Sequence, residues 1–286
     1  MKIDKFQASG NDFLVINNYR ETSFAALRDT ALRVCDRHFG LGSDGVLFLT
    51  PLEQGRYQFR IWNNNGSEAE ISGNGLIIAG AYAFSRTPPP PEGQVIFETK
   101  AGRREVKLLK EEGHIRWIRV NMGQPRFHSD EVPFCDGINY QKIVDYPLSI
   151  NQRMYNITVL SMGNPHAVVF MENFPSSFEL QQIGKEIEVH PFFPNHTNVE
   201  FVKVLNPQTV EVLFWERGVG ETLSSGSGSS AAAVASQMKG FTGKKVKVKT
   251  RAGDISIETV DETVYLEGYA QHIFSGEFFE GNATAG

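Results

Sequence analysis

Two short segments place serine and glycine directly before an apolar helix, and both could bind an anion. They are Ser72-Gly73-Asn74-Gly75 and Ser225-Gly226-Ser227-Gly228. The first backbone N–H groups of a helix have no partner within the helix and lie at the positive end of its dipole, so they attract a carboxylate. Either segment alone is more simply a helix cap, because serine is a favoured N-cap residue. Their presence once in each half of the chain favours an anion site.

The two segments belong to a longer internal repeat. Matching residues recur 153 positions apart (225 − 72 for the serines), and these pairs are Asn11 and Asn164, Trp62 and Trp215, Glu68 and Glu221, and Ser72 and Ser225. A further match, Ala101-Gly102 with Ala252-Gly253, is two positions out of step. Matches in one order along the chain indicate an internal duplication. Two copies of one half could present matched groups to opposite faces of one small molecule.

Each half is predicted to consist of many strands around one buried helix. The segments 76–84 and 229–238 are apolar all round, which is typical of a buried helix. The segments 22–38 and 178–187 have apolar residues every three or four positions, which predicts one amphipathic helix in each half.

These patterns predict an α/β (α+β) fold of two pseudo-symmetric domains. We expect the first domain to include residues 1–123 together with about 271–286, and the second to include residues 124–270.

Composition excludes several classes of function. The net charge of −5 gives no basic surface for a nucleic acid or a membrane. The two cysteines, Cys35 and Cys135, form no metal-binding motif and no disulfide framework. The chain starts without an apolar leader segment, so we expect a cytoplasmic protein.

A series of motifs runs from about residue 3 to about residue 275. They are Gly10-Asn11-Asp12-Phe13, Trp62-Asn63 with Gly66-Ser67-Glu68, Ser72-Gly73-Asn74-Gly75, Asn121-Met122-Gly123, Met162-Gly163-Asn164-Pro165-His166, Thr197-Asn198, Glu216-Arg217-Gly218 with Gly220-Glu221-Thr222, and Gly226-Ser227-Gly228. In order and spacing this series resembles the diaminopimelate epimerase family. The resemblance implies two barrel-like domains, each around a central helix, with the active site between them.

The resemblance also implies a reaction that needs no cofactor, neither pyridoxal phosphate nor a metal. In the family, two cysteines flank the α-carbon of an amino acid, one removing a proton and the other delivering one to the opposite face. Those two positions are Ser72 and Ser225 in this chain. An alcohol is a much weaker acid than a thiol, so a neighbouring base is needed, and His166 and Glu216 are the candidates.

The substrate-binding positions of the family keep their residue types here. The resemblance implies that Asn11, Asn63, Asn164 and Asn198 bind the distal amino acid group of a diaminopimelate-like substrate. Arg217 would bind the distal carboxylate and Glu216 the distal ammonium group. Backbone amides at Gly73-Asn74 and Gly226-Ser227 would hold the reacting carboxylate. The family often forms homodimers.

Three hypotheses remain open at this point. The first is an epimerase that converts LL-diaminopimelate to the meso form in lysine and peptidoglycan precursor synthesis. The second is an isomerase or dehydratase of the same fold, related to phenazine-pathway enzymes, that uses one base, His166 or Glu216. The third is a non-catalytic amino acid-binding homologue.

Overall fold

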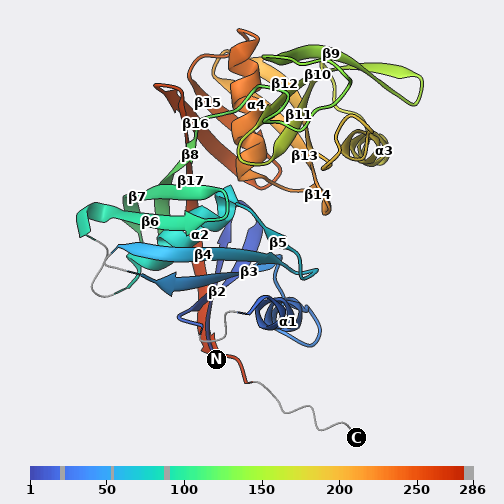
Figure 1. The fold of residues 1–286 in the computed structure, drawn as a ribbon. Helices are drawn as coiled ribbons and strands as arrows, with labels where there is room; N and C mark the ends of the chain where they lie inside the picture. Colours follow the sequence, from blue (N-terminus) through green and yellow to red (C-terminus); the bar gives the residue numbers. More distant parts are fainter. Residues whose placement is uncertain (20–22, 53–54, 87–90, 280–286) are drawn as a thin grey trace, which may run out of the picture. The chain divides into compact units, whose positions relative to one another are not determined.

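The chain divides into two compact units. The first consists of Met1–Glu70, Gly75–Ile118 and Tyr269–Gly286, and the second of Ile71–Asn74 and Arg119–Gly268. The computed structural model describes residues 1–19, 23–52, 55–86 and 91–279 (Figure 1). None of the helices in these ranges is long and apolar enough to cross a membrane.

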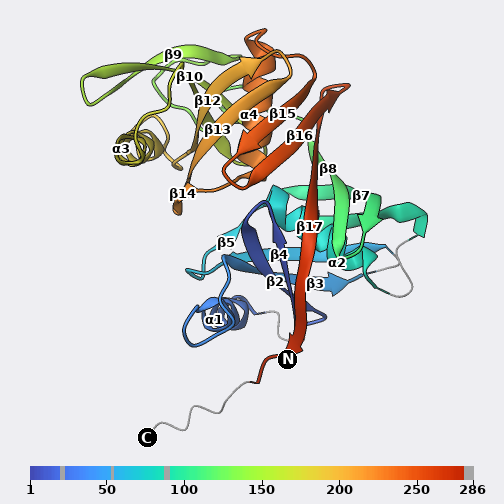
Figure 2. The ribbon, with the colours of Figure 1, turned by 180° about the vertical axis from the view of Figure 1, so that it is seen from behind.

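The first unit is a barrel of strands around one helix. Its elements are β1 (Lys2–Ala8), β2 (Asn11–Asn17), α1 (Phe24–Cys35), β3 (Gly45–Pro51), β4 (Arg56–Asn63), β5 (Glu68–Ala69), α2 (Gly73–Phe84) from Gly75 on, η1 (Pro91–Gly93), β6 (Gln94–Thr99), β7 (Gly102–Glu112), β8 (Ile115–Gly123) up to Ile118, and the second part of β17 (Thr263–Glu277). The strands pair in the order β1, β2, β3, β4, β6, β7, β8, β17, and β17 returns to β1. Figure 2 shows β7 and β8 side by side.

The second unit repeats this plan with its own strands and helices. Its elements are β9 (Ile143–Ile150), β10 (Arg153–Ser161), β11 (Pro165–Phe170), α3 (Ser177–Glu188), β12 (Asn198–Asn206), β13 (Thr209–Glu216), β14 (Gly220–Thr222), α4 (Gly226–Met238), β15 (Lys245–Thr250), β16 (Gly253–Val260) and the first part of β17. The strands pair in the order β9, β10, β11, β12, β13, β15, β16, β17, with β14 beside β13.

Strand register confirms the internal duplication. Strands β2 and β3 are parallel with Phe13 opposite Gly45, and β11 and β12 are parallel with His166 opposite Asn198. Both residues of the second pair lie 153 positions after those of the first (166 − 13 and 198 − 45). The repeat in the sequence is therefore a repeat of hydrogen-bonded geometry.

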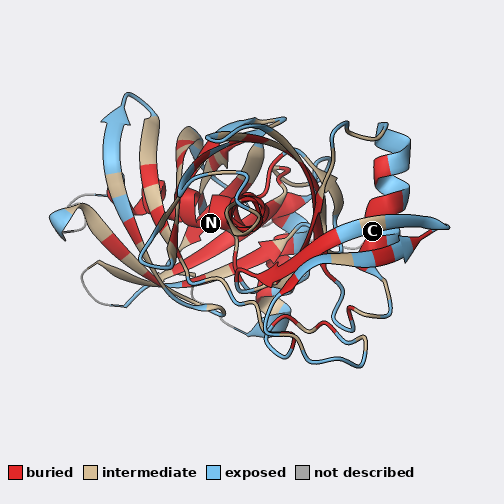
Figure 3. Ribbon diagram, turned by 90° about the horizontal axis from the view of Figure 1, so that it is seen from above, coloured by how far each residue is buried: buried red, intermediate tan, exposed pale blue. Residues whose placement is uncertain are grey.

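The central helices are buried along their length. Every residue of α2 is buried, and so are the residues of α4 from Gly226 to Ser236. Figure 3 shows such a helix, coloured red, within a ring of strands. Gly80 of α2 shows how tight this packing is, because a Cβ there would lie 2.6 Å from Val106 Cγ1. The predicted α/β fold of two duplicated halves, each with strands around a central helix, is confirmed.

The structure corrects the starting points of both central helices. We predicted helices from residues 76 and 229, but α2 begins at Gly73 and α4 at Gly226. Glycine and serine have weak helix propensity, so the apolar pattern alone missed the first turn. The Ser225 side chain accepts a hydrogen bond from the amide of Gly228 and thereby starts α4 three residues earlier.

Candidate functional site

Ser225 is the N-cap of α4 and makes two hydrogen bonds with different partners. Its Oγ accepts from the backbone N–H of Gly228 at 3.3 Å and donates to Oε2 of Glu216 at 3.3 Å. The same hydroxyl therefore contacts the positive end of the helix dipole and a carboxylate. This is the arrangement of a hydroxyl with an adjacent base.

Glu216 is held in place by a second hydroxyl. Thr222 Oγ1 donates to Glu216 Oε1 at 2.7 Å, because β13 turns into β14 and places Thr222 beside it. Burial of the carboxyl raises the pKa of Glu216, and the nearby negative charge of Glu200 adds to this rise. A carboxylate with a raised pKa is a stronger base and is better matched to proton transfer near neutral pH.

His166 is paired with a residue that the sequence did not suggest. Its Nδ1 lies 2.7 Å from Oε1 of Glu200, and its Nε2 lies 2.9 Å from Oδ1 of Asn164. Asn164 in turn donates from Nδ2 to Ser227 Oγ at 3.4 Å. Both His166 and Glu200 are almost completely buried. Burial raises the pKa of Glu200, while the hydrogen bond and charge of His166 act in the opposite direction.

The first turn of α4 packs against the Glu200 carboxylate of this buried pair. A Cβ on Gly228 would lie 2.7 Å from Oε1 of Glu200, so only glycine leaves room for the carboxylate. Both ring nitrogens of His166 are occupied by Glu200 and Asn164, whereas Glu216 contacts Ser225 directly. Of the two candidate bases, the geometry therefore brings Glu216, and not His166, to the Ser225 hydroxyl.

The two glycine-rich segments meet within the second unit. A Cβ on Gly226 would lie 2.6 Å from Gly73 Cα and 3.1 Å from the backbone nitrogen of Asn74. Only glycine at these positions lets the backbone of Gly73 and Asn74 lie directly against that of Gly226. Asn74 is buried, and its Oδ1 has no hydrogen-bond partner among the described residues. Ser72 immediately precedes this contact.

Asn198 fixes the backbone next to Glu216. Its Nδ2 donates to the carbonyl of Pro165 at 2.9 Å, and its Oδ1 accepts from the backbone N–H of Arg217 at 2.9 Å. The Arg217 guanidinium donates to the carbonyl of Asn195 at 3.1 Å.

Asn11 and Asn63 lie in the first unit. Asn11 Nδ2 donates to Asp44 Oδ2 at 2.7 Å, and Asn63 Nδ2 donates to Ser67 Oγ at 2.9 Å. Asp44 is itself paired with Arg37. In the ranges that the structure covers, no group of three or more His, Cys, Asp or Glu side chains is arranged to hold a metal ion.

Comparison with known proteins identifies the family of this chain. The sequence model of diaminopimelate epimerase matches residues 5–128 and 158–273. The chain belongs to the diaminopimelate epimerase family. Diaminopimelate epimerase of Pelotomaculum thermopropionicum is 39% identical over 97% of this chain and 99% of its own length. That of Moorella thermoacetica is 38% identical, again over 97% of this chain and 99% of its own length.

The fold of the diaminopimelate epimerase family extends to more distant structures. A predicted epimerase from Pseudomonas aeruginosa superposes with a TM-score of 0.72 at 14% identity, covering 98% of this chain and 99% of that one. Family membership makes this protein an isomerase of the amino acid epimerase class.

Sequence reasoning missed two residues that contact the candidate bases. Thr222 belongs to the motif Gly220-Glu221-Thr222 but was given no role, and Glu200 has no motif because it lies in an ordinary apolar strand, Asn198-Val199-Glu200-Phe201-Val202. One signal was available, because a glutamate flanked by valine and phenylalanine in a predicted buried strand requires a partner.

Proposed function

We propose that this protein epimerises LL-diaminopimelate to the meso form, without a cofactor, as a step of lysine and peptidoglycan precursor synthesis. The observation that carries the proposal is the Ser225–Glu216 hydrogen bond at the start of α4. It combines a hydroxyl, a carboxylate with a raised pKa and a helix N-terminus at one point. Family membership supports the substrate class.

The backbone amides of Gly73-Asn74 and Gly226-Ser227 are proposed to hold the reacting carboxylate. The backbones of Gly73 and Gly226 are in contact, and a Cβ on Gly226 would lie 3.1 Å from the backbone nitrogen of Asn74. A negative charge that develops at the α-carbon and its carboxylate would be stabilised there by fixed N–H dipoles. The unpaired Oδ1 of Asn74 could accept a hydrogen bond from the ammonium group beside that carboxylate.

Two proton transfers invert the α-carbon in the proposed reaction. Glu216 accepts the hydroxyl proton of Ser225 while Ser225 Oγ removes the proton from the α-carbon, so the C–H bond breaks and the O–H bond is restored. Ser72 delivers its hydroxyl proton to the opposite face of the α-carbon. Before the next turnover, Glu216 releases its proton to water and the Ser72 alkoxide takes a proton from water.

The distal half of the substrate is assigned to the residues that the resemblance implies. Arg217 would bind the distal carboxylate through two parallel N–H donors. Asn164 and Asn198 complete this set in the second unit, and Asn11 and Asn63 keep their implied role. Homodimer formation and a cytoplasmic location stay predictions.

Proton NMR of the purified protein with LL-diaminopimelate in D₂O tests the proposal. We expect the α-proton signal to disappear while the meso isomer appears. The matched control is Ser225→Ala, which removes the proposed base but leaves the glycines of both helix starts unchanged. Product formation at the wild-type rate by Ser225→Ala would contradict the mechanism.

A second candidate function is a one-base isomerase, and the asymmetry of the duplication favours it. The positions in the first half that correspond to His166, Glu200 and Glu216 are Phe13, Leu47 and Asn63 (each 153 residues earlier). At these three positions, only the second half has ionisable side chains. Deuterium exchange at the α-carbon without inversion would support this candidate. Binding with neither exchange nor inversion would support the non-catalytic homologue.

A further inference from the structure

Glu188 connects two donors on either side of the Glu216-Arg217 pair. Its Oε2 accepts from Trp215 Nε1 at 2.6 Å, and its Oε1 accepts from the backbone N–H of Gly218 at 2.8 Å. We propose that Glu188 is a positioning residue that fixes Glu216 and Arg217 and thereby sets selectivity for a substrate with a distal carboxylate. The selectivity part of this inference rests on the proposed function.

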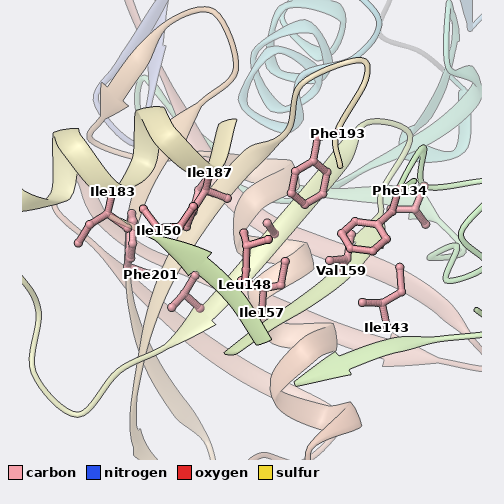
Figure 4. Close-up of a cluster of buried hydrophobic side chains, with 14 of the residues drawn as sticks. Phe134, Ile143, Leu148, Ile150, Ile157, Val159, Ile183, Ile187, Phe193 and Phe201 are labelled. Carbon is pink, nitrogen blue, oxygen red and sulfur yellow. The ribbon is translucent and has the colours of Figure 1, made fainter. Parts of the chain in front are cut away.

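Packing of helix α3 fixes the position of Glu188. Glu188 is the last residue of α3, and Ile183 and Ile187 of the same helix belong to the buried apolar cluster of the second unit (Figure 4). Helix α3 also contacts Trp215 directly, since a Cβ on Gly184 would lie 2.6 Å from Trp215 Cγ. Movement of the carboxylate would therefore require movement of a packed helix.

A carboxylate is an unfavourable choice at this place in a helix. The C-terminus of a helix carries the negative end of the dipole, so an anion is disfavoured there. Glu188 is also nearly buried, with 10% of its side chain exposed. Its two hydrogen bonds, from Trp215 and Gly218, offset these two costs. For the stability of helix α3 alone, an apolar residue would be a better choice than glutamate at this buried position.

The first half of the duplication provides an internal comparison. The residues 153 positions before Glu188 and Trp215 are Cys35 and Trp62. Cys35 accepts a hydrogen bond from Ser43, whereas Trp62 Nε1 is buried with no hydrogen-bond partner among the described residues.

The residues that correspond to Glu216 and Arg217 are Asn63 and Asn64. The carboxylate that accepts from the tryptophan is thus found in the half that carries the charged pair, and cysteine replaces it in the half that does not.

A second contact completes the restraint on Arg217. The backbone N–H of Arg217 donates to Asn198 and that of Gly218 donates to Glu188, so two consecutive amides are fixed by side chains from different elements. The Arg217 side chain therefore extends from a rigid backbone. Because the Arg217 backbone is already fixed, less conformational entropy is lost when its guanidinium binds a substrate carboxylate.

The variant Glu188→Gln tests this inference with little change in shape. An amide side chain has one acceptor oxygen, so one of the two N–H donors would face an NH₂ group. Glu186→Gln is the matched control, because Glu186 is exposed on the same helix turn. Two properties are measured for each protein: the hydrogen exchange rate of the Gly218 amide without substrate, and the ratio of dissociation constants for lysine and diaminopimelate. Lysine is diaminopimelate without the distal carboxylate.

We expect Gly218 to exchange roughly three- to tenfold faster in Glu188→Gln, the range for one lost hydrogen bond. We also expect the preference for diaminopimelate over lysine to fall by about tenfold, with Glu186→Gln unchanged in both properties. Unchanged exchange of Gly218, or faster exchange with unchanged preference, would overturn the inference. A wild-type protein that binds neither amino acid would instead contradict the proposed function, and Gly218 exchange would still decide whether Glu188 fixes the segment.

A second pair of variants covers the case in which Glu188→Gln does not fold. Trp215→Phe and Trp62→Phe each replace an indole by a phenyl ring, but only Trp215→Phe removes a hydrogen bond to Glu188. We expect faster Gly218 exchange in Trp215→Phe than in Trp62→Phe. Equal rates in these two variants would contradict the positioning role.

Discussion

Replacement of Ser72 and Ser225 by cysteine is expected to accelerate α-proton exchange in diaminopimelate. An alcohol is a weaker acid than a thiol by roughly five pKa units, which is ~7 kcal/mol at about 1.36 kcal/mol per unit. Without any assistance, serine would therefore be slower than cysteine by a factor on the order of 10⁵.

The Ser225–Glu216 hydrogen bond reduces this expected difference. General-base assistance by a positioned carboxylate typically contributes about 10²- to 10⁴-fold. Since Glu216 lies within hydrogen-bonding distance of Ser225, it would recover that part of the loss. The double cysteine variant should therefore exceed the wild type by about 10- to 10³-fold.

The assay is the rate of deuterium incorporation at the α-carbon, followed by proton NMR in D₂O. The serine and cysteine proteins are compared twice, once with Glu216 and once with Glu216→Gln. If Glu216 assists serine, the gain from cysteine should be larger in the Glu216→Gln background, where serine has lost its base. Equal gains in both backgrounds, with substrate bound in all four proteins, would refute the role of Glu216 as the base for Ser225.

Three further predictions concern stability. Gly226→Ala should lower the free energy of unfolding by ~1–3 kcal/mol in urea denaturation, because its Cβ would clash with Gly73, whereas Gly243→Ala, with nothing within 4 Å of its Cβ, should not. The difference in melting temperature between Glu216→Gln and the wild type should be more positive at pH 8 than at pH 5. A carboxyl whose pKa is raised in the folded protein contributes stability at low pH that is lost as the pH rises through that pKa, and glutamine does not titrate. The same difference at both pH values would contradict this. Ser176→Ala should cost about 1 kcal/mol by removing the capping box of α3, and an unchanged unfolding midpoint would show that this cap is dispensable.

The sequence by itself determined the duplicated architecture. The two halves repeat one pattern of apolar residues, turns and glycines, and they repeat the strand pairing as well. Trp62 lies opposite Val46, and Trp215 lies opposite Val199, so both partners are 153 residues apart. The two helices that are apolar all round could only be buried, and they are. The serine and glycine residues before them marked the helix starts, although not the first helical residue.

Only the tertiary structure decided which polar groups are partners. The sequence offered His166 and Glu216 as equivalent bases, but the fold brings the Glu200 carboxylate, 34 residues away in the chain, to the His166 ring and leaves Glu216 beside Ser225. Glu188 likewise reaches Trp215 and Gly218, 27 and 30 residues away. A hydrogen bond depends on distances of a few tenths of an ångström between atoms that folding brings together, and residue spacing along a chain does not contain those distances.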